Sequence, residues 1–87
     1  MNETISEYFE RHQRKAPEVV DLRGLEPPEP LVNILLTCSR MKRDEEFLVH
    51  LPHVPNPLFP HLEAREMEWR VFEQTDGSAL VLIWSVS

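Results

Sequence analysis

The sequence predicts an α/β (α+β) two-layer sandwich, in which two helices lie on one face of a four-stranded mixed sheet. Three observations indicate this fold class. The chain has 87 residues, which suffice for one hydrophobic core but not for two. Segments with the apolar pattern of strands take turns along the chain with segments of helical spacing. Seven of the eight prolines fall between positions 27 and 60, where they mark loops and helix starts.

A short amphipathic helix is predicted over residues 4–14. Thr4 and Glu7 have the spacing of a capping box, in which each side chain binds the backbone amide of the other residue. One stripe at helical spacing follows: Ile5, Tyr8, Phe9 and His12. We treat residues 1–16 as an N-terminal amphipathic extension and residues 17–87 as the main domain.

The first strand and the first long helix come next. Residues 19–22 are rich in strand-forming side chains and are closed by Arg23 and Gly24. Prolines are tolerated in the first turn of a helix, because amide hydrogens there have no partner, so the Pro-rich segment predicts a helix over residues 28–41. Four side chains form its apolar stripe: Leu31, Ile34, Leu35 and Cys38.

A second strand and a second helix follow a charged turn. Residues 47–51 alternate as a strand, and Leu48 and His50 share the face opposite the other three. A helix is predicted over residues 56–65, with Asn56 as its N-cap. Glu66 then stands where a glycine would normally turn the chain in the left-handed conformation.

The last two strands form a hairpin. Residues 67–71 alternate between apolar and charged side chains, as a half-buried strand does. Asp76 and Gly77 form a pair that favours a two-residue hairpin turn. Residues 79–84 are apolar on both faces, which predicts an inner strand of the sheet.

The order of these elements predicts where a site would lie. A right-handed crossover makes the first two strands parallel and places both long helices on one face of the sheet. The loops after these strands emerge together at one end of the sheet, here called the loop edge, where open α/β sheets tend to bind ligands. Five residues are predicted to converge there: Arg23, Glu26, His50, His53 and Asn56.

Arg23 has two interpretations at the loop edge. It could clamp an anion at the start of the long helix, because free amide hydrogens there attract negative charge. It could instead pair with one of the acids nearby in sequence, which are Asp21, Glu26 and Glu29. We favour the structural pairing.

Composition and charge exclude several classes of protein. The formal charge of −6 has the wrong sign for a nucleic-acid partner. The longest apolar run, residues 79–84, is far shorter than the about 20 residues of a membrane span. Residues 1–16 lack the pattern of a secretory signal, so a cytoplasmic location is expected. With Cys38 as the single cysteine, no internal disulfide forms.

Two motifs resemble a known family. Residues 21–30, DLRGLEPPEP, resemble the signature of the TusA or SirA sulfur carriers, whose helix opens with Gly-Leu-x-Cys-Pro-x-Pro, although Pro27 replaces the cysteine. Together with residues 53–58, HVPNPL, they resemble domain of unknown function 2249 (DUF2249), a relative of that family, over residues 18–84. The resemblance implies a TusA/SirA-like βαβαββ fold with strand order 1-2-4-3. Val54 departs from it, since relatives often have an acid there.

The side chains offer little chemistry for catalysis, so we expect no enzyme. Proline at position 27 has no nucleophile, and Cys38 is expected to be buried in the helix's apolar stripe. No serine or threonine sits in a glycine-rich elbow. His50, His53 and His61 could bind zinc or another transition metal, with Glu26, Glu63 or His12 as further ligands. We favour ordinary structural and surface roles for these histidines, and hence no cofactor.

Two functions remain open. The favoured one is a non-enzymatic binding or regulatory module on a sulfur-carrier scaffold, which recognises a protein or a small anion at the loop edge. The alternative is a histidine-based metal or cofactor binder in a redox or nitrogen-oxide pathway, since relatives occur joined to hemerythrin-like and cupin modules. Two layers leave one sheet face uncovered, and the N-terminal helix either covers it or docks a second chain to form a homodimer.

Overall fold

A computed structural model describes residues 3–86 of the chain. Helices and strands alternate along it as predicted, with one 3₁₀ turn added before the last helix. In chain order the elements are α1 (Ile5–Arg11), β1 (Val19–Asp21), α2 (Glu29–Arg40), β2 (Glu46–Leu51), η1 (Asn56–Leu58), α3 (Phe59–Ala64), β3 (Met67–Glu73) and β4 (Ala79–Ser85).

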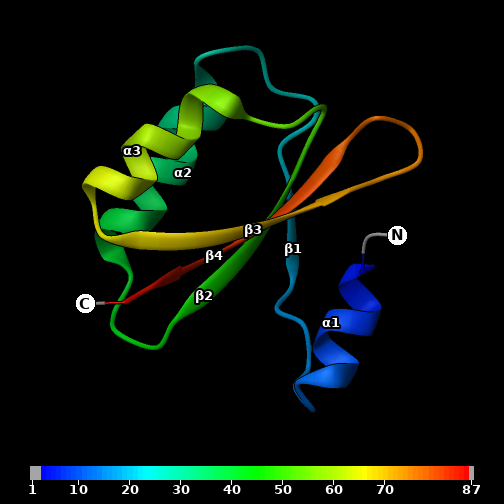
Figure 1. Cartoon of the computed structure of the whole chain (residues 1–87). Helices are drawn as coiled ribbons and strands as arrows, with labels where there is room; N and C mark the ends of the chain where they lie inside the picture. The colour runs from blue at the N-terminus through cyan, green and yellow to red at the C-terminus, as the bar shows by residue number, and fades with distance from the viewer. Residues whose placement is uncertain (1–2, 87) are drawn as a thin grey trace.

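The four strands form one mixed sheet in the order β1-β2-β4-β3, which confirms the expected topology (Figure 1). β1 and β2 are parallel, and the register places Asp21 beside His50. β4 is antiparallel to both of its neighbours and lies inside the sheet. Its apolar side chains therefore find a partner surface on either face, as the sequence predicts for an inner strand.

Both α2 and α3 cover the same face of the sheet (Figure 1). Because side chains alternate along a strand, every second residue of β2 and β4 points into this layer. Ile34 of α2 and Leu62 of α3 are almost fully buried against them. The buried members of this core are Leu22, Ile34, Cys38, Val49, Leu51, Leu58, Leu62, Met67, Ala79, Val81 and Ile83.

The opposite face of the sheet is covered by the chain's own α1. Tyr8 and Phe9 are buried there. The side chains of the sheet beneath them are Leu48, Phe72, Leu80 and Leu82. The N-terminal helix was expected either to cover this sheet face or to dock a second chain. In the structure it covers the sheet face of its own chain.

α1 has the predicted start but a shorter length. The capping box is present, because Thr4 N donates to Glu7 Oε1 at 2.8 Å and Glu7 N donates to Thr4 Oγ1 at 3.2 Å. The helix ends at Arg11 rather than near residue 14. Gln13 has a φ of 53°, which no helical residue adopts, and this turns the chain toward β1.

Two turns differ from the prediction and one agrees with it. Asn56 does not cap a helix with its side chain; a 3₁₀ turn, η1, begins there and leads into α3. The hairpin loop has three residues rather than two, because Gln74 N donates to Ser78 O and Gly77 takes a positive φ of 88°. Glu66 does adopt the left-handed conformation, with φ of 57°.

None of the helices within residues 3–86 has the length and hydrophobicity that crossing a membrane requires.

A candidate binding pocket at the loop edge

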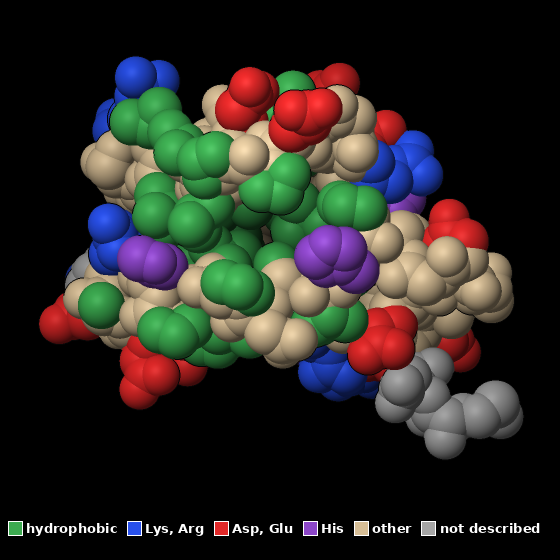
Figure 2. Space-filling model, turned by 90° about the horizontal axis from the view of Figure 1, so that it is seen from above, with side chains coloured by type: hydrophobic (Ala, Val, Ile, Leu, Met, Phe, Trp, Pro, Cys, Tyr) green, Lys and Arg blue, Asp and Glu red, His purple; other side chains and the backbone are tan. Residues whose placement is uncertain are grey.

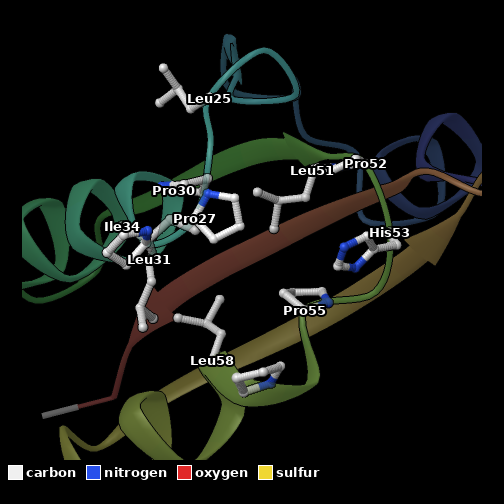
Figure 3. A pocket seen from close by; sticks show the side chains of 12 residues that line it. Leu25, Pro27, Pro30, Leu31, Ile34, Leu51, Pro52, His53, Pro55 and Leu58 are labelled. Atoms are coloured by element: carbon white, nitrogen blue, oxygen red, sulfur yellow. The ribbon is translucent and has the colours of Figure 1, made fainter.

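A cavity of about 320 Å³ opens at the loop edge, between the start of α2 and the loop that follows β2. Figure 3 shows side chains from these two segments facing one another across it. Its lining residues are Leu25, Pro27, Pro28, Pro30, Leu31, Ile34, Leu51, Pro52, His53, Pro55, Pro57 and Leu58. We call this cavity the proline pocket, because six of these twelve residues are prolines.

The prolines give the pocket its apolar and rigid walls. Proline has no amide hydrogen and a fixed φ, so it offers a ligand neither a donor nor much conformational freedom. Three of the six lie at the start of α2: Pro27 precedes the helix, Pro28 is its N-cap and Pro30 is in its first turn, where proline is tolerated. The other three lie in the loop after β2 or in η1. The two motifs that carry the family resemblance, residues 21–30 and 53–58, therefore build opposite walls of one cavity.

His53 supplies the only polar side chain among the residues that line the proline pocket. Its ring lies beside Pro55 at the mouth of the cavity (Figure 3). Its Nδ1 is 3.3 Å from the carbonyl oxygen of Val54, and the described residues offer Nε2 no partner. Because the carbonyl oxygen only accepts, Nδ1–H is the donor to it, and Nε2 of the neutral imidazole can accept one hydrogen bond at the rim of an otherwise apolar site.

His50 does not join His53, and its predicted convergence on the same site is wrong. The strand alternation already puts His50 on the face of Leu48, which packs toward α1, whereas the pocket lies on the face of α2 and α3. The Nε2 atom of His50 is 2.8 Å from Ser78 Oγ, which in turn donates to Asp76 Oδ1 at 2.6 Å. Since the hydroxyl hydrogen is used, His50 Nε2–H is the donor to Ser78.

This chain of hydrogen bonds has a structural role. Ser78 is only 4% exposed, and the carboxylate of Asp76 binds the serine rather than the histidine. The arrangement therefore lacks the oriented base that activates a serine nucleophile. It fastens the β3–β4 hairpin to β2. The Asp-Gly pair in the sequence marks the hairpin, but the partnership with His50 depends on the β2–β4 register.

Arg23 is held by Asp21 rather than poised for an anion. Its Nε donates to Asp21 Oδ1 at 2.9 Å and its Nη2 donates to Asp21 Oδ2 at 2.7 Å. The bidentate guanidinium lowers the pKa of the Asp21 carboxyl well below its usual range. Of the two interpretations of Arg23, the structure has the pairing with a nearby acid. Glu26 and Asn56 are exposed beside residues that line the proline pocket.

The histidines proposed as metal ligands are distributed over separate parts of the fold. His53 lies in the loop after β2, His61 lies on α3, and His50 binds Ser78 on the other face of the sheet. His12, one of the further ligands considered, has its Nδ1 2.8 Å from the carbonyl oxygen of Tyr8. Within residues 3–86, no three His, Cys, Asp or Glu residues lie close enough together to hold a metal ion.

The residue at which the sequence departs from the sulfur-carrier motif that it resembles is part of the same pocket. Pro27, which the resemblance compares with the carrier cysteine, lines the cavity. Cys38 lies far along α2 in the core, and burial raises the pKa of its thiol. Its sulfur is therefore both covered and protonated at neutral pH.

Comparison with known protein families identifies the chain's family. The sequence model of a family described as uncharacterised conserved proteins, DUF2249, matches residues 19–85. No curated protein matches the chain. The match leaves out α1 and includes all four strands and every residue that lines the proline pocket. Because it spans more than three quarters of the sequence, the chain belongs to the DUF2249 family.

Proposed function

We propose that this protein is a non-enzymatic binding module whose proline pocket receives an apolar side chain of a protein partner. The observation that carries the proposal is the pocket itself, which has rigid apolar walls and a single polar group at its rim. Its volume of about 320 Å³ is at the lower end of the range typical of ligand sites, and suits one large side chain.

The surface around the pocket favours a protein as the partner. Figure 2 shows that apolar side chains continue beyond the hollow over the neighbouring surface. On α2, Val32 and Leu36 are each 49% exposed, and Leu35 is partly buried against the core. Apolar surface that extends beyond a cavity typically marks a protein interface, where a central anchor is surrounded by further contacts.

A small anion, the other ligand expected at the loop edge, is less well supported. In the part of the chain that the structure describes, no lysine or arginine lines the pocket, and Arg23 is already bound to Asp21. Catalysis also has less support than binding, because His53 is the only ionisable side chain among the lining residues. The buried, unpaired Cys38 fits a reducing compartment such as the cytoplasm.

Titration with indole, a probe of the size of one large side chain, tests the pocket. We expect amide and methyl NMR shifts at Leu31, Ile34, Leu51 and Leu58, and a change at the His53 ring. Leu31→Gln places an amide in the wall and should weaken the shifts at least about threefold, since burying an unpaired polar group is costly. Leu36→Gln is the matched control, because this exposed leucine of the same helix does not line the cavity. Shifts confined to the C-terminal end of α2, or none at all, would reject the site.

A further inference from the structure

We infer that the partner segment carries a positively charged side chain next to the apolar side chain that enters the proline pocket. This inference rests on the proposed function and specifies the chemistry of the partner. It follows from the acids that flank the pocket, from the absence of cations among its described lining residues, and from the size of the cavity.

Two acidic residues at the start of α2 are direct sequence neighbours of residues that line the pocket. Glu26 lies between Leu25 and Pro27, and Glu29 lies between Pro28 and Pro30, so each acid is bracketed by residues that line the cavity. Both acids are exposed. Figure 2 shows acidic side chains beside the hollow apolar surface.

These two acids are available to a partner. Other carboxylates of the molecule are engaged within the chain: Glu3, Glu46 and Asp21 pair with arginines. Among the described residues, neither Glu26 nor Glu29 has an ion-pair partner or a side-chain hydrogen bond. Glu29 also suits the positive end of the α2 dipole, but Glu26 precedes the helix and has no such role.

The charge at the pocket mouth is therefore negative. The nearest arginine in sequence, Arg23, has its charge balanced by Asp21 at 2.7 Å. The whole chain carries a formal charge of −6, which adds to the same sign. A cation on the partner is attracted to this mouth, and a carboxylate is repelled, as long as salt does not screen the interaction.

The cavity also sets the distance between the anchor and the cation. About 320 Å³ is filled by one large side chain, so the residues before and after it in the partner remain outside, at the rim. Neighbouring residues of an extended segment are about 3.3 Å apart, and a lysine side chain reaches several ångströms further. Successive side chains of an extended segment point to opposite sides, but a lysine side chain is long and flexible enough to reach back from the position beside the anchor to Glu26 or Glu29 at the rim.

Three short peptides that differ only in charge test the inference: acetyl-Trp-Lys-amide, acetyl-Trp-Gln-amide and acetyl-Trp-Glu-amide. Each is titrated into the full chain at low salt and followed by NMR at the pocket. We expect the lysine peptide to bind roughly twofold to fivefold more tightly than the glutamine peptide, and the glutamate peptide to bind more weakly, as for exposed ion pairs. Raising the salt to about 0.5 M should reduce these differences.

Variants assign the effect to the two acids. Glu26→Gln combined with Glu29→Gln should remove most of the difference between the three affinities, whereas Glu63→Gln combined with Glu68→Gln, which changes the net charge equally, should leave it nearly unchanged, because those exposed acids do not flank the pocket. If all three peptides bind the unmodified protein with equal affinity, measured from the NMR shifts of pocket residues, the inference about charge is wrong. The same holds if the glutamate peptide binds most tightly. In both cases the proposed binding function of the pocket still stands. If none of them shifts the pocket, the proposed function fails as well.

Discussion

His50 and His53 illustrate how far single residues can be assigned from the sequence. Both were expected at the loop edge, and both lie toward the carboxyl end of β2. Strand alternation decides which face of the sheet a side chain takes, and it sends His50 away from the pocket. The pairing of Arg23 with Asp21 was predictable because the two are neighbours in sequence. The bond from His50 to Ser78 was not, because it joins residues 28 positions apart.

Ser78→Ala should destabilise the protein. The substitution removes a buried hydroxyl that donates to Asp76 and accepts from His50, so the imidazole loses its partner. We expect a loss of about 1–2 kcal/mol in the free energy of unfolding, measured with urea. Ser39→Ala is the control: this exposed hydroxyl bonds only to a helix carbonyl, and its loss should cost less than about 0.5 kcal/mol. Equal losses in the two variants would show that the His50 network does not stabilise the hairpin.

Stability should fall at acidic pH, in part through Asp21. Its pKa is lowered in the folded protein by the hydrogen bonds and charge of Arg23. A carboxyl with a lowered folded pKa stabilises the fold above its unfolded pKa, near 3.9, and this contribution is lost as the pH falls through the folded value. Unfolding midpoints measured from pH 5 to pH 2 should therefore decline less in Asp21→Asn than in the unmodified protein. An unchanged decline would assign the acid sensitivity to the other carboxyls with lowered pKa, Glu3, Glu7 and Asp76.

Among the elements, α1 shows most clearly what local sequence can and cannot specify. The capping box fixed its start, since both bonds lie within four residues. Its end depends on the positive φ of Gln13, for which a residue other than glycine gives no signal. The docking of α1 on the sheet of its own chain depends on tertiary packing rather than on local sequence. Tyr8 and Phe9 make it favourable by covering Leu48 and Phe72.

Removing residues 1–16 should make the chain self-associate. Without α1, the apolar side chains that it covers face water, and a second copy can bury them by packing sheet against sheet. We expect the mass measured by light scattering to rise with concentration in the truncated chain more than in the full chain. A homodimer through this sheet face, one of the arrangements considered from the sequence, would require α1 to move away. A truncated chain that stays monomeric at all concentrations would contradict it.

For the whole molecule, the topology was more predictable than the site. The composition of residues 79–84 indicated an inner strand, and the family resemblance supplied the order 1-2-4-3 that the sheet has. The proline pocket could not be predicted in the same way. Prolines 27 to 57 indicate loops and helix starts one by one, whereas their joint surface arises only when two segments more than 20 residues apart meet. The site predicted from the sequence therefore consisted of polar side chains, whereas the residues that line the cavity are almost all apolar.

Amide hydrogen exchange should follow the sheet order. β4 is paired on both sides, and Val81, Leu82 and Ile83 are fully buried, so their amides should exchange most slowly. The three residues of β1 form an exposed edge and should exchange much faster. NMR exchange rates of the full chain test this ranking. Slowest exchange in β1 or in α1 would mean that the most stable unit of the protein lies outside the central strands.

The proline walls limit which parts of a partner the pocket can recognise. Strand addition, in which a bound peptide extends a sheet, requires free amide hydrogens on the receiving protein. The six prolines that line the pocket have none, so the main chain of a partner gains little from them. Recognition of the proposed partner is then expected to depend mainly on side chains. The anchor can arrive from a helix, a strand or a loop, and a peptide built from mirror-image residues should lose less affinity here than at a site that pairs with the backbone.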